Sequence, residues 1–296
     1  TIPTYFREPH KPLNVNYAAE VKKHLHIPVA VVGMITTLEE AEDIIASGKA
    51  DIVAMAKSFM ADGDIIHKSL AGESAEVRPC TRCDLCGNAN TYGTAMSCAI
   101  NPRCGIAGEI EQLPEAERKN VMVVGGGPAG MMAAQTLVKR GHTVTLYEKA
   151  DKLGGLLIDA SMVPFKQLMR EYLDWDIKET LNCGAKIVLN TAVTESLIEQ
   201  EDPDAIIVAT GSVYVNPPIP GMDSALAVRD VDSHAVEPGK NVVVCGGGIT
   251  GLECALALAQ EGKTVTVVDM LPRENFVMEM PIFNKADLLA QLEEMG

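Results

Sequence analysis

Alternating apolar runs and helical patterns predict one β-α-β unit near the start of the chain. Residues 27–33 form a short apolar run that ends in glycine, and residues 50–56 form a second one. Between them, an acidic helix start at Thr36 to Glu40 is followed by apolar residues at helical spacing. Short, continuous apolar runs are typical of parallel strands that are buried on both faces. We therefore expect two strands of an α/β domain within residues 1–72.

A pattern of strand, glycine-rich turn, helix and strand occurs twice, about 121 residues apart, from Gly125 to Gly246. In each copy the second strand stops at a carboxylate, Glu148 or Asp269. The first copy spans residues 120–124, 125–130, 131–140 and 143–147, and the second spans 241–245, 246–251, 252–260 and 264–268. Between the copies the pattern predicts a helix over 165–182, strands over 185–189 and 205–208, and a proline-rich linker over 217–221.

The two glycine-rich turns are typical of dinucleotide-binding folds. Glycine permits the tight turn, the close approach of a pyrophosphate and the close packing of helix on strand. The start of the following helix offers free amides to the phosphates, and a carboxylate at the end of the second strand accepts hydrogen bonds from ribose hydroxyls. Asp269 favours NADH because a carboxylate repels a 2′-phosphate, although the nearby Arg273 could reverse that preference.

Four cysteines lie within residues 73–118, where regular periodicity fails. Their spacing is Cys80-x2-Cys83-x2-Cys86-x11-Cys98. Three thiolates at three-residue steps can surround one face of a cubane cluster, and a distant fourth can complete its ligands. A tetrahedral zinc site is the alternative, but zinc sites more often use two separated cysteine pairs. Cys104 is a fifth thiol that could replace Cys98.

A phosphate site is predicted where the two strands near the start of the chain end. Gly33 follows the first of them and Lys57 follows the second. In α/β barrels the loops after the last two strands commonly bind a phosphate. Lys57 would supply the positive charge.

Charge and cysteine content narrow the function classes. The 296 residues include 25 Lys and Arg against 40 Asp and Glu, a net charge of −15, which repels the phosphate backbone of nucleic acid. We see no apolar run of membrane-spanning length and no signal-peptide pattern. Eight cysteines are too few for a disulfide scaffold in a chain of this length. We therefore expect a cytoplasmic protein without a nucleic-acid or membrane partner.

Taken in order, these motifs resemble the NADH:flavin oxidoreductase, or old yellow enzyme-like, family that includes 2,4-dienoyl-CoA reductase, 2-enoate reductase and trimethylamine dehydrogenase. The motifs that carry the resemblance are Ile27 to Gly33, Ala50 to Lys57, Arg78-Pro79-Cys80, Gly125 to Gly130, Ala209-Thr210-Gly211 and Gly246 to Gly251. A complete barrel needs about 250 residues, but only residues 1–72 precede the cysteine segment. The chain is therefore expected to be a fragment. The resemblance implies four parts: the end of an FMN-binding TIM barrel over 1–72, a 4Fe-4S segment over 73–118, a Rossmann-like FAD domain over 119–238 and a truncated NAD(P)H domain over 239–296, both glutathione-reductase-like.

The resemblance also implies roles for individual residues. It assigns the FMN phosphate to Gly33, Met34, Ala56 and Lys57, where Met34 and Lys57 depart from the family's arginine pattern. It assigns FAD to Gly125, Gly127, Ala129, Gly130, Glu148, Gly155, Lys166 and Val193, the nicotinamide cofactor to Gly246, Gly248, Gly251 and Asp269, and the cluster to Cys80, Cys83, Cys86 and Cys98. The catalytic acid is expected upstream of Thr1.

The activity that the resemblance implies is reduction of an activated C=C bond in an unsaturated acid or thioester. Electrons would pass from NADH through FAD and the cluster to FMN. The alternatives are an amine dehydrogenase of the same family, an electron-input module for a partner oxidoreductase, and a non-catalytic scaffold that holds zinc and ADP. The barrel-like strands before the cysteines argue against the electron-input module.

Overall fold

The computed structural model describes residues 4–6, 12–215 and 218–296, so that part of the predicted linker, Pro217, lies outside the described residues. The chain divides into two compact units. Unit 1 comprises Thr1–Glu111, Pro164–Tyr172 and Val242–Gly296, and unit 2 comprises Gln112–Val163 and Leu173–Asn241. The division falls within one helix, α9, which spans Gln167–Asn182.

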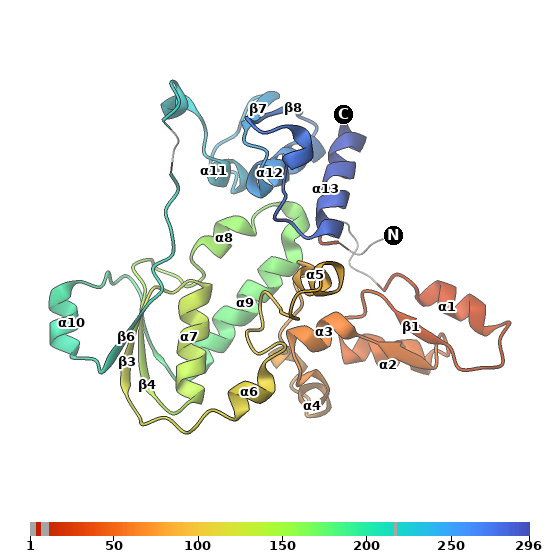
Figure 1. Ribbon diagram of the computed structural model, residues 1–296, viewed down its shortest axis with the longest axis horizontal. Coiled ribbons are helices and arrows are strands. Elements are labelled where there is room, and N and C mark those ends of the chain that lie inside the picture. Colours follow the sequence, from red (N-terminus) through yellow and green to blue (C-terminus); the bar gives the residue numbers. More distant parts are fainter. Residues whose placement is uncertain (1–3, 7–11, 216–217) are drawn as a thin grey trace. The chain divides into compact units, whose positions relative to one another are not determined.

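Unit 2 is built on a four-stranded parallel sheet in the order β5-β4-β3-β6 (Figure 1). Val123 of β3 lies opposite Leu146 of β4 and Ile207 of β6. This order, with the first strand of the unit inside the sheet, is that of one half of a Rossmann fold. The strands are β3 Asn120–Val124, β4 Thr143–Tyr147, β5 Lys186–Val188 and β6 Ala205–Val208, and the helices are α7 Pro128–Lys139, α8 Leu156–Ala160, α10 Glu195–Glu201 and α11 Val228–Asp232.

The core of unit 2 lies between this sheet and helix α7. Val123, Met131 and Leu146 are fully buried there, and Leu173 at the start of the unit 2 part of α9 packs against them. Because β3 and β4 carry apolar side chains on both faces, the pairing register of these central strands is strongly specified. The sheet therefore holds the turn after β3 in a defined position.

The first part of unit 1 contains the predicted β-α-β unit. Strands β1 Ala30–Val32 and β2 Ile52–Ala54 are parallel, with Val31 opposite Val53. Thr37 and Glu40 form a capping box at the start of the helix between the strands, which satisfies amides that have no partner within the helix. The helices of this part are α1 Val15–Lys22, α2 Leu38–Ala46, α3 Ala56–Ala61 and α4 Ile65–Leu70.

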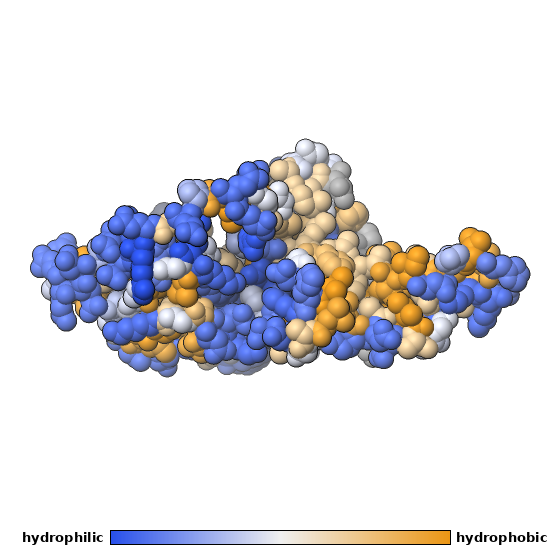
Figure 2. Space-filling view, turned by 90° about the horizontal axis from the view of Figure 1, so that it is seen from below, coloured by the Kyte–Doolittle hydropathy of each residue, from blue (hydrophilic) through white to orange (hydrophobic). Residues whose placement is uncertain are grey.

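Apolar residues lie on the surface of the β1–β2 segment as well as in its core. Ile35, Ile44 and Ile65 are buried, whereas Val32 is 54% exposed and Ile52 is 53% exposed. Figure 2 shows hydrophobic surface over this part of unit 1. The prediction that these strands are buried is therefore wrong for most of their residues: β1 buries Val31 alone, and β2 buries none. Exposed apolar strand faces fit a piece of a larger α/β domain.

The rest of unit 1 holds the cysteine segment and the second strand–turn–helix pattern. The cysteine segment contains α5 Leu85–Tyr92 and α6 Ala107–Glu111. The second pattern consists of β7 Asn241–Cys245, α12 Ile249–Gln260, β8 Thr264–Val268 and α13 Ile282–Met295, with β7 and β8 paired. Short 3-10 helices span Ser74–Glu76, Pro164–Lys166 and Arg273–Asn275 in unit 1 and Met222–Ser224 in unit 2.

The predicted strands of both glycine-turn patterns agree with the structure, and the helices begin earlier than predicted. Helix α7 begins at Pro128 and α12 at Ile249, because the helix starts at the residue after the third glycine of each turn. Proline is favoured at this first helical position since its missing N–H has no partner there. The helix predicted over 165–182 begins as a 3-10 turn and continues as α9.

The division into two units differs in grouping from the four predicted domains. The boundaries near 112 and 241 lie close to the predicted boundaries at 118–119 and 238–239, but one unit holds the β1–β2 segment, the cysteine segment and the second turn. The four domains stay a prediction. Among the described residues, we find no helix that is both long and apolar enough to cross a membrane.

Candidate functional site

The first glycine-rich turn is closely packed in unit 2. A Cβ atom on Gly130 would lie 1.8 Å from the carbonyl oxygen of Gly125, and one on Gly125 would lie 2.3 Å from the carbonyl oxygen of Ala209. Gly125 also has φ +108°, a conformation that disfavours other residues. The turn therefore needs glycine at both positions, and Ala209 of the predicted Ala209-Thr210-Gly211 motif borders it.

One further glycine of this turn, Gly127, borders a glycine of the loop that follows β4. The atom nearest to a Cβ on Gly127 would be the Cα of Gly155, at 3.9 Å. The Gly154 amide donates a hydrogen bond of 2.8 Å to the Gly126 carbonyl, which ties the two loops together. Backbone without side chains at Gly127 and Gly155 leaves the close approach that a pyrophosphate requires. These residues fit the FAD site that the sequence predicts.

Glu148 at the end of β4 binds the turn directly. Its Oε2 accepts a hydrogen bond from the Gly126 amide at 2.5 Å, and its Oε1 accepts one from the Ala150 amide at 2.8 Å. Each carboxylate oxygen has a second lone pair, so Glu148 can also accept a hydrogen bond from a ribose hydroxyl. Its predicted contact with ribose stays a prediction.

The second turn, in unit 1, repeats this geometry. Asp269 at the end of β8 accepts hydrogen bonds from the Gly247 amide at 2.6 Å and the Leu271 amide at 2.7 Å. The Gly247 amide is the main cause that lowers the pKa of Asp269 below its usual range. A Cβ on Gly251 would lie 2.1 Å from the carbonyl oxygen of Gly246, whereas one on Gly248 would meet nothing within 4 Å. The turn therefore has the features of a dinucleotide site.

Lys166 and Val193 are the less direct parts of the predicted FAD site. Lys166 is 8% exposed, and its ammonium group donates to Oε2 of Glu253 on α12 at 2.5 Å. Glu253, itself 4% exposed, also accepts a hydrogen bond from the Tyr5 hydroxyl at 2.8 Å. Val193 lies in the loop between β5 and α10 of unit 2. Sequence patterns did not reveal the Lys166–Glu253 pair, because its members are 87 residues apart.

The predicted FMN phosphate residues come together in one pocket. Gly33, Met34, Ala56 and Lys57 line a cavity of about 190 Å³ at the ends of β1 and β2. Gly33 has φ +126° and Met34 has φ +55°, so the first loop turns sharply. Arg82 of the cysteine segment lines the same cavity. The sequence analysis did not identify Arg82, and its position between Cys80 and Cys83 was the available signal.

The cysteine segment is anchored on helix α3 at both of its ends. Before the first cysteine, the Arg78 guanidinium donates to the Ala61 carbonyl at 3.3 Å, and after the fourth, the Asn101 amide donates to the Met60 carbonyl at 2.8 Å. In the middle, Lys57 forms an ion pair with the buried Asp84. These contacts hold the cysteines beside the loop that follows β2.

Asp62 at the end of α3 fixes the entry to this segment. It accepts hydrogen bonds from the Arg78 amide at 2.9 Å, the Lys68 ammonium at 2.7 Å and the Asp64 amide at 3.0 Å. Burial would raise the pKa of Asp62, but the bond from Lys68 and the two amides lower it below its usual range. The carboxylate therefore stays charged and holds three elements together.

The four predicted cluster cysteines are half-buried thiols. Burial is the main cause that raises the pKa of Cys80, with Cys83 and Cys98 adding to it and the amide and charge of Arg82 opposing it. Burial likewise raises the pKa of Cys86 to about 11. A bound metal would displace these protons, since the thiolate is the form that binds metal.

These thiols interact electrostatically without forming a compact single-ion site. Beyond the effect of burial, Cys80 and Cys83 raise the pKa of Cys86, and Cys98 raises the pKa of Cys104. Within the described ranges, no three His, Cys, Asp or Glu side chains are close enough to hold one metal ion. A four-iron cluster spreads its cysteine ligands more widely than a single ion does. Four thiols on one anchored segment, each of which interacts with at least one of the others, fit such a group.

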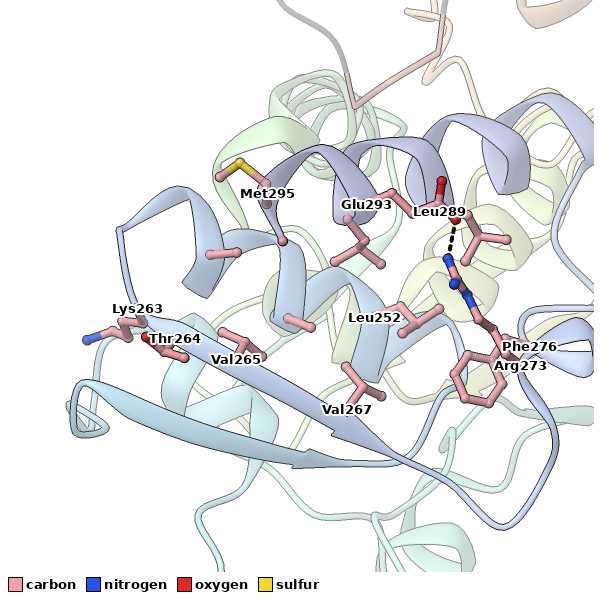
Figure 3. Close-up of a pocket in the computed structure, with 14 residues that line it drawn as sticks. Leu252, Lys263, Thr264, Val265, Val267, Arg273, Phe276, Leu289, Glu293 and Met295 are labelled. Atoms are coloured by element: carbon pink, nitrogen blue, oxygen red, sulfur yellow. Dashed lines mark hydrogen bonds and ion pairs between the residues drawn. The ribbon is translucent and has the colours of Figure 1, made fainter.

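A separate cavity of about 600 Å³ lies between α12, β8 and α13 (Figure 3). Leu252, Val265, Phe276 and Leu289 give it a largely apolar lining, and Arg273 pairs with Glu293 at its edge. Its described lining includes neither Asp269 nor any glycine of residues 246–251. The cavity is therefore distinct from the second dinucleotide turn.

Parallel strands, two glycine-rich turns and a carboxylate bound to each turn define a dinucleotide-binding oxidoreductase fold. Residues 119–287 match the family model of pyridine nucleotide-disulphide oxidoreductases. The chain belongs to this family. The match extends over both turns and supports the predicted FAD and NAD(P)H folds.

Longer relatives confirm the family resemblance that the motifs predicted. The chain is 38% identical over 293 residues to an NADH oxidase of Thermoanaerobacter brockii, covering 95% of this chain and 44% of that protein. It is 36% identical to a cinnamate reductase of Clostridium sporogenes, covering 88% of this chain and 39% of that protein. A structure of 2-naphthoyl-CoA reductase with 2-naphthoyl-CoA matches with a TM-score of 0.88 and 28% identity, over 100% of this chain and 45% of that one. The chain spans less than half the length of these relatives.

Proposed function

We propose that this chain forms the cluster-binding and dinucleotide-binding part of an oxidoreductase that uses NAD(P)H to reduce an activated C=C bond. The observation that carries the proposal is the anchoring of the cysteine segment on the β1–β2 segment. Arg78 and Asn101 tie its ends to α3, and Asp84 pairs with Lys57 in the predicted FMN phosphate loop. Such an arrangement keeps a cluster close to a flavin.

The four cofactor sites use different residues of the chain. Cys80, Cys83, Cys86 and Cys98 hold a 4Fe-4S cluster, and the pocket at Gly33 and Lys57 holds the phosphate of FMN. The turn at Gly125 to Gly130, with Glu148, holds FAD, and the turn at Gly246 to Gly251, with Asp269, holds NADH. When bound, these groups supply hydride transfer at the flavins and nicotinamide and single-electron transfer at the cluster.

The protein residues orient these groups and exclude water from them. The Gly126 and Gly247 amides fix the carboxylates that accept ribose hydroxyls. The closely packed glycines bring backbone amides to the pyrophosphates. The half-buried environment of the cysteines shields a cluster from solvent, which is one of the factors that set its potential.

The substrate class follows from the relatives' names and remains a proposal for this chain. Cinnamate is an unsaturated acid, and 2-naphthoyl-CoA is an unsaturated thioester. In both, a carbonyl group withdraws electrons from the carbon framework and so activates it towards hydride. We propose an unsaturated acid or thioester as the substrate of the full-length protein.

The test compares cofactor content in the full-length polypeptide, purified without oxygen, with that of two cysteine variants. We expect about four irons per chain, as Cys-ligated cubanes contain, together with FMN and FAD. Cys83→Ser should lose iron, whereas the matched control Cys183→Ser, in unit 2, should keep it. NADH-dependent bleaching of the flavin absorbance and reduction of cinnamate should follow the iron content.

Three outcomes would contradict the proposal. Stoichiometric zinc with no iron would favour the zinc and ADP scaffold. NADH oxidation that reduces only an added electron-acceptor protein would favour the electron-input module. Reduction of the flavins by secondary amines but no cinnamate reduction would favour the amine dehydrogenase.

A further inference from the structure

The pocket at the ends of β1 and β2 is lined by a buried cation that has an unpartnered donor atom among the described residues. Arg82 lines this cavity of about 190 Å³ and is 4% exposed. Its Nε atom is buried and has no hydrogen-bond partner in the part of the chain that the structure describes. Burying a charged group without partners is costly, and such groups are normally paired. An anion in the cavity would remove that cost.

The second cation at this pocket is already neutralised. Lys57 forms its ion pair with Asp84, which is 6% exposed and does not line the cavity. Among the described residues that line the cavity there is no aspartate or glutamate. The net positive charge of the pocket therefore comes from Arg82.

The volume of the pocket is large enough for a phosphate group together with the first atoms of the ribityl group of FMN. Its volume of about 190 Å³ is several times the share of one water molecule in the liquid, about 30 Å³. The loop at Gly33 and Met34 has two successive residues with positive φ, so the backbone bends around the cavity. A guanidinium group matches phosphate oxygens in a bidentate geometry that lysine cannot provide.

We propose that Arg82 binds the phosphate of FMN and that it links FMN binding to assembly of the iron–sulfur cluster. This inference rests on the proposed function. Arg82 lies between Cys80 and Cys83 in the sequence and lines the cavity. Cluster ligation at both cysteines fixes the backbone on either side of Arg82. The arginine that the phosphate loops themselves lack is thus supplied by the cluster segment.

The experiment measures binding of FMN, riboflavin and coenzyme A to the full-length protein after its flavins have been removed. Riboflavin lacks the phosphate, and coenzyme A carries phosphate without flavin. Arg82→Ala should weaken FMN binding about 10- to 100-fold, the effect of removing a charge-assisted hydrogen bond. It should leave riboflavin binding unchanged, and Arg82→Lys should restore part of the loss. The matched control is Arg103→Ala, an exposed arginine of the same segment that pairs with Glu111.

The linkage has its own readout. In the wild-type protein, removal of the cluster should lower FMN affinity towards the Arg82→Ala value. In Arg82→Ala, cluster removal should have little further effect, because the two changes act through the same side chain. Iron content and circular dichroism of each variant establish that it is folded and loaded.

Several results would overturn the inference. An equal loss of FMN and riboflavin affinity would show that Arg82 shapes the flavin site without binding phosphate. Unchanged FMN affinity with weakened coenzyme A binding would assign the pocket to the substrate. Equal effects of cluster removal in wild type and variant would break the linkage. In each case a wild-type protein with four irons and NADH-driven cinnamate reduction would leave the proposed function intact.

Discussion

Glu148 accepts a hydrogen bond of 2.5 Å from the amide of Gly126, the middle glycine of its own turn. Asp269 accepts a bond of 2.6 Å from Gly247, the glycine at the same place in the second turn. The two residues of each pair are 22 positions apart. Each carboxylate therefore holds its own turn in place. The internal repeat of the sequence is a repeat of this geometry.

Two glycines of the first turn are predicted to respond differently to alanine. Gly130→Ala places a Cβ 1.8 Å from the Gly125 carbonyl oxygen, so the turn must open. We expect a loss of about 1–3 kcal/mol in the free energy of unfolding, as for other overpacked sites, and loss of FAD. Gly127→Ala places its Cβ no closer than 3.9 Å to protein atoms. We expect this variant to stay folded and to lose FAD affinity alone.

Urea unfolding and flavin release measured by fluorescence separate these two effects. Gly239→Ala is the control, since a Cβ there would meet nothing within 4 Å and its φ is not positive. It should change neither quantity. If Gly127→Ala retained full FAD affinity, the pyrophosphate would not cross this turn. If Gly130→Ala were as stable as wild type, the close packing would be wrong.

Protonation of the Asp62 carboxylate in acid is predicted to make unit 1 less stable. Its three hydrogen bonds, from Lys68 and from the amides of Arg78 and Asp64, favour the charged carboxylate and lower its pKa. A carboxyl group whose pKa is lower in the folded state stabilises the fold at pH values above its unfolded-state pKa, which is about 3.9 for aspartate. That contribution is lost as pH falls through the lower, folded-state pKa. Asp62→Asn should therefore cost about 1–3 kcal/mol at neutral pH, the cost of a broken buried hydrogen bond.

The measurement is urea unfolding of wild type and Asp62→Asn at pH 7 and near pH 3. The difference between the two proteins should shrink at the lower pH, because the carboxyl of the unfolded state binds a proton there while the lowered pKa of the folded state resists protonation. Asp43→Asn, an exposed position on α2, should stay within about 0.5 kcal/mol at both pH values. A stability difference that does not depend on pH would contradict the role of the Asp62 charge.

Local patterns predicted the strands and turns, while contacts between distant residues escaped them. The strands at Asn120 and Asn241 were found because an apolar run, glycines and a carboxylate lie within about thirty residues of each other, as in any unit of this kind. The ion pair between Lys57 and Asp84 joins residues 27 positions apart, and no periodicity marks it. The position of Arg82 depends on how an irregular segment folds back on α3. Such contacts are set by tertiary packing, which a single sequence does not display.

The pair formed by Lys166 and Glu253 leads to the last prediction. Both side chains are buried, at 8% and 4% exposure, and their charges balance. Lys166→Met would remove the ammonium partner of Glu253 and leave the hydrogen bond from the Tyr5 hydroxyl. Breaking such a buried pair costs about 3–5 kcal/mol. The double variant Lys166→Met with Glu253→Gln removes both charges but keeps an acceptor for Tyr5. It should recover most of the lost stability, as measured by urea unfolding.

The FAD content of this double variant also tests the predicted role of Lys166 in FAD binding. Because the Lys166 ammonium is neutralised by Glu253, we expect the double variant to retain FAD as well as wild type does. The control is Lys178→Met, an exposed position on helix α9, which begins directly after Lys166; it should change neither stability nor FAD content. A folded double variant without FAD would establish Lys166 as a flavin ligand. A double variant as unstable as Lys166→Met would show that packing, rather than charge balance, makes the pair important.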